Sequence, residues 1–180
     1  MGRQIALLRG INLGPHRRVA MGDLRSLLAE AGYADVRTHL QSGNVVLTSD
    51  TAPDDLARDL ERRIATGLGV DAGVVVRTRD ELADVVARDP LRGVVDDPRR
   101  YQVTFRSGEP EPDAVRELER VAVAPERIVV SGREIYAWHP NGIGRSELAA
   151  ELARARFGVT ATARNWNTVT KLLELADDAG

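Results

Sequence analysis

The chain has 180 residues, a formal net charge of −2 and no cysteine. That length suits one domain or two small ones with a buried core. The lack of cysteine excludes disulfides, thiolate zinc sites and a cysteine nucleophile, and is typical of a reducing compartment. With 25 basic and 27 acidic residues, binding to nucleic acid or to an anionic membrane would need a local patch of charge. No run approaches the ~18 apolar residues of a membrane span, so we expect a cytoplasmic protein without a membrane partner.

The first half of the chain alternates strand-like and helix-like patterns. In the predicted helices, apolar residues recur every three or four positions, as on one face of a helix. In chain order we predict a strand at Gln4–Ile11, a helix at Met21–Ala31, a hairpin at Val36–Thr48, a helix from Pro53 to Leu68, a strand at Val74–Val76, and a short helix at Glu81–Ala87 capped by Asp80.

The second half repeats this layout after a polar linker at residues 91–99. Its predicted elements are a strand at Tyr101–Arg106, a helix at Asp113–Val121, a hairpin at Arg127–Trp138, a helix at Ser146–Phe157, a strand at Thr160–Ala163 and a closing helix at Trp166–Ala176.

Two hairpin signals, Ser42-Gly43 and Ser131-Gly132, lie about half the chain apart and indicate one unit used twice. The predicted fold class is α+β, with two tandem ferredoxin-like (β-α-β-β-α-β plus helix) halves and mainly antiparallel sheets. We place the first half at residues 1–90 and the second, with the C-terminal helix, at 100–180.

The first candidate site combines two loops that this topology places at one end of a sheet, residues 10–18 and 41–44. Cations, amides and flexible backbone there are typical of a site for an anion or a polar ligand. The alternative is that the glycines serve turns and the arginines are solvated. The candidate residues are Arg9, Gly10, Asn12, Gln41, Ser42 and Asn44.

The second candidate lies between a strand and a helix and comprises Gly142, Gly144, Arg145 and Ser146. A helix N-terminus preceded by glycines and an arginine can bind phosphate. Glu147 occupies the third glycine position of the dinucleotide fingerprint, so that motif is not matched. The alternative is a turn in which Ser146 caps the helix.

The third candidate is the densest polar set of the chain, Arg164, Asn165, Trp166, Asn167 and Thr168. An arginine, amides and a hydroxyl around one tryptophan can form a recognition surface. The alternative is that Asn165 caps the last helix and Trp166 packs against it.

Other chemistries find less support in the sequence. His16, His39 and His139 show no metal-ligand spacing, and Ser42 lacks the G-x-S-x-G motif, so catalytic residues stay unassigned and we expect no metal or cofactor. Aromatic residues alternate along two strands of the second half. This pattern is typical of RNA recognition motifs, and it would equally arise if the aromatic side chains filled a core. Without a basic excess nucleic acid is disfavoured as a partner, though not excluded. The sequence leaves the oligomeric state open.

Four motifs in order, LRGINLG, QSGNVVL, PNGIGRSEL and RNWNTVTKLLEL, resemble the bacterial family catalogued as domain of unknown function 1697. The resemblance runs from about Ile5 to Leu175 and implies an α/β protein of two similar halves with no established activity. The family's motif positions coincide with the three polar clusters. The chain departs from the family pattern at Pro15, Ala20 and Glu147, and the last of these places an anion beside the second candidate site.

The leading hypothesis is a non-catalytic binding protein that takes a small anionic or nucleotide-like ligand, or a polar partner, at residues 9–18 and 41–44. The other two clusters would contribute if the halves fold back on each other. One alternative is an enzyme in which Arg9 or Arg164 binds an oxyanion near His16 or Ser42. A further alternative is an RNA-binding or homo-oligomeric interaction module.

Overall fold

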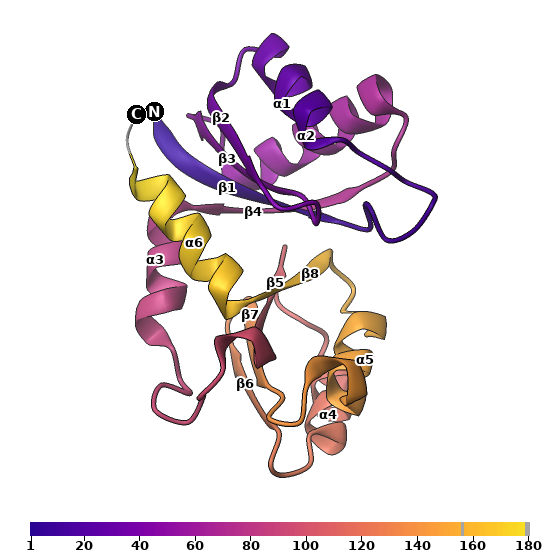
Figure 1. Ribbon diagram of the computed structural model, residues 1–180, viewed down its shortest axis with the longest axis vertical. Helices are drawn as coiled ribbons and strands as arrows, with labels where there is room; N and C mark the ends of the chain where they lie inside the picture. Colours follow the sequence, from indigo (N-terminus) through magenta and orange to yellow (C-terminus); the bar gives the residue numbers. More distant parts are fainter. Residues whose placement is uncertain (156, 179–180) are drawn as a thin grey trace. The chain divides into compact units, whose positions relative to one another are not determined.

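The computed structural model describes residues 1–155 and 157–178 (Figure 1). Its contacts form two compact units, one of Met1–Ala83 with Lys171–Gly180 and the other of Asp84–Thr170. The division falls inside two helices, α3 (Arg79–Arg88) and α6 (Trp166–Asp177). Within the described part of the chain, no helix has both the length and the apolar character needed to cross a membrane.

The first unit is built on a four-stranded antiparallel sheet in the order β2-β3-β1-β4. Figure 1 shows α1 and α2 together on one face of this sheet. Its elements are β1 (Gly2–Arg9), α1 (Met21–Glu30), β2 (Ala34–His39), β3 (Asn44–Ser49), α2 (Pro53–Leu68) and β4 (Gly73–Thr78).

The core of the first unit fills the space between the sheet and these two helices. Alternate strand residues such as Ala6, Leu8, Val45 and Leu47 face the helices and are buried, because side chains of a strand point to opposite faces in turn. In α2 the buried residues are spaced four apart, as the sequence predicts, and Gly69 ends the helix in the left-handed conformation (φ 66°) that glycine tolerates.

The second unit has the same strand arrangement, in the order β6-β7-β5-β8. The predicted class of two tandem α+β halves with antiparallel sheets is therefore confirmed. The elements are the short 3-10 helix η1 (Pro98–Arg100), β5 (Tyr101–Arg106), α4 (Pro112–Val121), β6 (Arg127–Ser131), β7 (Glu134–Trp138), the 3-10 helix η2 (Ile143–Arg145), α5 (Glu147–Arg154) and β8 (Ala161–Asn165).

The aromatic residues of this sheet are buried. Tyr101 and Tyr136 lie on neighbouring strands with ring centroids 6.3 Å apart. The Tyr101 hydroxyl donates to Asp89 Oδ1 (2.7 Å) and the Tyr136 hydroxyl to the Val85 carbonyl (2.8 Å). Phe105 and Trp138 are also buried. These aromatic side chains fill a core, so they provide no exposed platform on which bases could stack.

Two local predictions were wrong. The first hairpin turns through the four residues 40–43 and not at a two-residue Ser42-Gly43 turn, because Leu40 takes a left-handed conformation (φ 61°) and its carbonyl accepts from the Gly43 amide. Helix α3 is capped by Thr78 and not by Asp80. Thr78 Oγ1 accepts from the Glu81 amide (3.1 Å) and Glu81 Oε2 from the Thr78 amide (2.8 Å), which is a capping box.

Candidate functional site

Asn12 ties the loop after β1 to the hairpin turn. Its Nδ2 donates to the carbonyl of Val19 (2.9 Å) and to that of Gln41 (2.7 Å), and its Oδ1 accepts from the Val19 amide (2.9 Å). The Asn12 backbone is left-handed (φ 55°), a conformation that asparagine adopts more readily than most residues. One side chain therefore holds together two loops that are distant in sequence, as the predicted topology requires.

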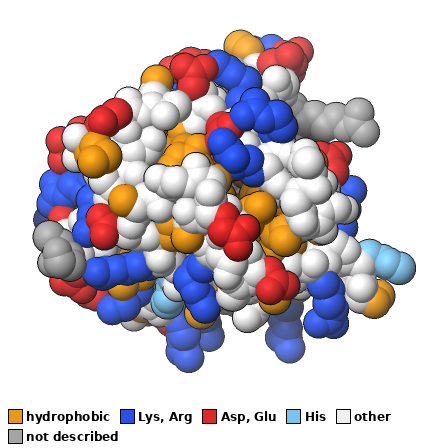
Figure 2. Space-filling model, turned by 90° about the horizontal axis from the view of Figure 1, so that it is seen from above, with side chains coloured by type: hydrophobic (Ala, Val, Ile, Leu, Met, Phe, Trp, Pro, Cys, Tyr) orange, Lys and Arg blue, Asp and Glu red, His pale blue; other side chains and the backbone are white. Residues whose placement is uncertain are grey.

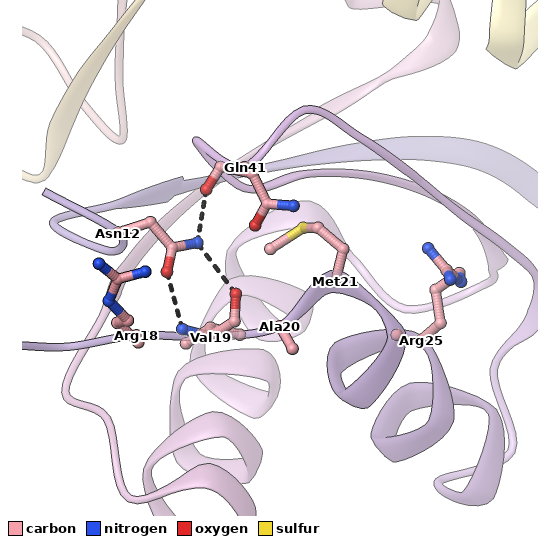
Figure 3. Close-up of a pocket in the computed structure, with 8 residues that line it drawn as sticks. Asn12, Arg18, Val19, Ala20, Met21, Arg25 and Gln41 are labelled. Carbon is pink, nitrogen blue, oxygen red and sulfur yellow. Dashed lines mark hydrogen bonds between the residues drawn. The ribbon is translucent and has the colours of Figure 1, made fainter. Parts of the chain in front are cut away.

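A pocket of about 560 Å³ lies between these loops and the start of α1. Figure 3 shows Asn12 and Gln41 at its upper side, with Met21 projecting toward Gln41 and Arg18 and Arg25 on opposite sides. The volume is within the usual range of small-molecule sites. The lining residues are Asn12, Arg18, Val19, Ala20, Met21, Gly22, Arg25 and Gln41.

The electrostatics of this pocket favour an anion. Its lining includes two arginines and no carboxylate, and it opens at the N-terminus of α1, where the helix dipole is positive. The N-cap Ala20 makes no side-chain capping bond, and Asp23 in the first turn carries the opposing charge without lining the pocket. Arg25 Nη1 donates to Thr38 Oγ1 (2.5 Å). Arg18 has no ion pair or hydrogen bond within the described residues.

A second pocket of the same unit, of about 630 Å³, lies near the start of β1 and is less suited to an anion. Its lining includes Asp50, Asp80 and Asp177. Its lining also includes two arginines, of which Arg79 is held by Asp177 (2.6 Å) and Asp80 (3.1 Å) and Arg3 lies 3.9 Å from Asp35. Carboxylates at this density repel an anionic ligand.

The other predicted residues of the first cluster serve the backbone or lie outside the pocket. Asn44 is fully buried, and its Nδ2 donates to the His39 carbonyl (2.7 Å) and to Ser42 Oγ (3.1 Å), so it closes the hairpin. Arg9 is exposed at the end of β1, and Gly10 supplies a turn with φ 78°. Neither lines the pocket.

In the second cluster, Ser146 is engaged in the structure around it. Its Oγ accepts from the Ala149 amide (2.9 Å), which caps α5 as the alternative reading predicted, and it donates to Glu126 Oε2 (2.5 Å). Gly142 turns the chain with φ 96°, Gly144 lies in η2, and Arg145 is exposed. A serine committed to these two bonds has little capacity left for a phosphate.

Glu126, His139 and Ser146 form a largely buried polar cluster that does not have the geometry of a catalytic triad. Both Glu126 Oε2 (2.7 Å) and Ser146 Oγ (2.9 Å) lie at the same ring nitrogen, His139 Nδ1. A triad needs the acid and the nucleophile on different ring nitrogens. His139 Nε2 is buried and has no hydrogen-bond partner among the described residues.

In the third cluster the polar groups are largely used within the unit. Arg164 is buried, and its Nη1 donates to Thr162 Oγ1 (2.7 Å) and to the Ala163 carbonyl (2.8 Å). Burial lowers the pKa of Arg164 to about 10. Asn165 Oδ1 accepts from the Thr168 amide (2.9 Å), so it caps α6. Trp166 is half-buried against Tyr101, with ring centroids 5.0 Å apart, Thr168 is buried, and Asn167 is exposed.

The structure thus brings Asn12 and Gln41 together at the pocket and places the remaining predicted residues elsewhere. Sequence reasoning missed Met21 and Arg25 as lining residues. The signal was available, because residues four apart on a helix share a face, and here they share the face at the beginning of α1. No sequence motif or alternation of residue types marks that helix face as polar, so the sequence indicated only a helix that packs on a core.

Fold and pocket together define a two-unit α+β protein with a basic pocket beside the first sheet. The chain belongs to the family described as protein of unknown function (DUF1697), whose model matches residues 1–136. Among solved structures it is similar to the conserved bacterial protein SP0830 from Streptococcus pneumoniae, with 21% sequence identity, a TM-score of 0.79, and coverage of 97% of this chain and 98% of the other. That likeness shows the fold. None of the curated proteins compared with the chain matches it.

Proposed function

We propose that this protein is a non-catalytic, cytoplasmic binding protein whose pocket at Asn12 takes a small anionic or nucleotide-like ligand. The observation that carries the proposal is a pocket whose lining includes two arginines, Arg18 and Arg25, and no carboxylate. Guanidinium groups bind phosphate and carboxylate oxygens through charge-assisted hydrogen bonds. The Asn12 bonds keep both loops in place, so little ordering is needed when a ligand binds.

An enzyme reading receives no comparable support from the described residues. The Ser42 hydroxyl accepts from Asn44 Nδ2 (3.1 Å) and takes part in closing the hairpin turn. Groups of three or more metal-binding side chains are also not found in the described part of the chain.

The repeated element order and strand order support a further proposal, that the two units arose by duplication of one ferredoxin-like unit.

The binding proposal is tested by thermal-shift screening with inorganic phosphate, sugar phosphates and nucleotides, because a ligand that binds the native state raises Tm. Arg18→Ala and Arg25→Ala should each weaken binding about tenfold, as expected for the loss of one charge-assisted contact. The matched control is Arg116→Ala, which removes an exposed arginine of α4 that pairs with Asp113. Absence of any shift with all probes would overturn the proposal, and so would equal weakening by the control.

A further inference from the structure

Two exposed leucines adjoin, in sequence, two residues that line the Asn12 pocket, and neither leucine is itself part of the lining. Leu13 is 85% exposed and Leu40 is 54% exposed. Leu13 follows Asn12 and Leu40 precedes Gln41 in sequence, and Asn12 Nδ2 donates to the Gln41 carbonyl at 2.7 Å. The bond that shapes the pocket therefore also fixes the positions of the two leucine backbones. Single exposed apolar side chains are ordinary on a protein surface, so exposure alone does not mark these two leucines as functional.

Leu40 is distinguished by its backbone. Its φ is 61°, in the left-handed region that disfavours residues with a Cβ and that glycine or asparagine would occupy at lower cost. A leucine at this position is unfavourable both in conformation and in solvation. Strained backbone conformations of this kind concentrate at functional sites. An apolar ligand surface that covers the Leu40 side chain would offset the cost of its exposure to water.

The pocket itself also offers apolar surface beside its charges. Met21 and Val19 are buried core residues that line it together with Ala20, between the two arginines. In Figure 3 the Met21 thioether lies between Gln41 and Arg25. In Figure 1 the loop after β1 extends to the right-hand side, and Figure 2 shows apolar side chains (orange) exposed among charged and other ones on the face that it presents. The lining of the pocket thus combines cationic and apolar groups.

We propose that the ligand of the Asn12 pocket is an amphipathic anion, with its anionic group bound by the arginines of the lining, Arg18 and Arg25, and its apolar portion against Leu13 and Leu40. This inference rests on the proposed function and specifies the class of ligand. A free alkyl phosphate or carboxylate and the headgroup region of an anionic lipid share this chemistry. If the ligand is an anionic lipid, the arginines of this region supply the local positive charge that the near-neutral net charge of the chain does not.

The test compares methyl phosphate with hexyl phosphate by titration calorimetry on the full chain. Hexyl phosphate should bind at least about tenfold more tightly, since each buried methylene adds to affinity. The double variant Leu13→Ser/Leu40→Ser should lose this preference and keep the affinity for methyl phosphate. The matched control is Val123→Ser, which removes a 67% exposed apolar side chain of the second unit and should leave the preference unchanged.

The outcomes separate the two proposals. If methyl phosphate and hexyl phosphate both fail to bind, the anion pocket itself is wrong. If they bind equally, or if the preference survives the double substitution, the pocket stands and the amphipathic class is overturned. Co-sedimentation with phosphatidylcholine vesicles, with and without phosphatidylglycerol, distinguishes the sources. Leucine-dependent retention on the anionic vesicles supports a lipid, and leucine-dependent binding of hexyl phosphate alone supports a free amphiphile.

Discussion

At the scale of single residues, we expect that a substitution of Leu40 can stabilise the protein. Its backbone lies at φ 61° and its side chain is exposed, so Leu40→Asn should raise the free energy of unfolding by about 1 kcal/mol. Urea denaturation measures this change. The exposed Leu13, which is not among the positive-φ residues, is the control, and Leu13→Asn should change stability by no more than about 0.5 kcal/mol. A destabilised Leu40→Asn variant would show that Leu40 has a packing role.

Substitution of Asn12 should lower the free energy of unfolding for two separable reasons, the loss of its side-chain hydrogen bonds and the strain of its left-handed backbone. Asn12→Ala removes three side-chain hydrogen bonds and leaves a residue with a Cβ at φ 55°, so we expect a loss of about 2 to 4 kcal/mol. Asn12→Gly removes the same bonds without the conformational cost and should lose about 1 kcal/mol less. Chemical denaturation of both variants measures the difference. Equal losses would mean that the backbone relaxes around alanine.

At the scale of elements, the two hairpins provide a matched pair of glycines. Gly43 (φ 88°) and Gly132 (φ 57°) both need the left-handed region, but their surroundings differ. A Cβ at Gly43 would lie 2.7 Å from Ile11 Cδ1 and 2.8 Å from Leu8 Cβ, whereas at Gly132 it would meet nothing within 4 Å. The first turn is therefore closely packed on β1 and the second is open.

Alanine at each of these positions should separate steric crowding from backbone preference. Gly132→Ala should cost about 1 kcal/mol, from the left-handed conformation alone. Gly43→Ala should cost at least about 1 to 3 kcal/mol more, because Leu8 Cβ belongs to a strand and cannot move aside. Thermal unfolding of the two variants side by side measures this. Similar losses would contradict the packing of the first hairpin.

Helices and strands could be predicted from the sequence wherever a single hydrophobic pattern determined which side chains are buried. The four-residue spacing of Leu56, Leu60 and Ile64 predicted α2 because a single helix face is buried. The turn at 40–43 could not be predicted, since nothing in the type of Leu40 indicates a left-handed conformation. Thr78 was also missed as the cap of α3, because it ends a strand and caps the following helix at once.

The candidate site was less predictable than the fold, for a physical reason. Topology alone placed Asn12 near Gln41, but the choice of the residues that line the pocket depends on hydrogen bonds between side chain and backbone. Arg164 looked like a ligand residue in the sequence and is buried within its unit. Arg25 was assigned no role within the helix predicted at Met21–Ala31, and it lines the pocket. Residue type does not determine which of two arginines is exposed to a ligand.

At the scale of the whole molecule, the tyrosines predict instability at alkaline pH. Burial, with the hydrogen bond to Asp89, raises the pKa of Tyr101, and burial raises that of Tyr136 to about 12. Burial and the hydrogen bond to Asp59 also raise the pKa of Tyr33. The ordinary value is 10.0, so the unfolded chain ionises first. The stabilisation is complete below the unfolded pKa and is lost as pH rises through the folded values.

For Tyr136 alone this loss amounts to roughly 2 to 3 kcal/mol once pH exceeds the folded pKa. Urea unfolding at increasing alkaline pH should show it, and tyrosinate absorbance of the native protein should rise later than that of the unfolded chain. Tyr136→Phe removes the ionisable group and should reduce the pH dependence, with a small loss at neutral pH from the bond to the Val85 carbonyl. An unchanged pH profile in this variant would contradict the assignment.

The passage of the chain between its two units within α6 has a practical consequence. Lys171, the single lysine of the sequence, is the first residue of α6 that belongs to the first unit, and its ammonium is half exposed beside Glu174 (2.9 Å). An amine-reactive fluorophore would therefore label one side chain of the whole protein, besides the α-amino group of Met1. Trp166, at the start of the same helix, is close enough along the chain to act as an energy donor. Fraying of α6 would then be visible as a loss of transfer between them, without any engineered cysteine.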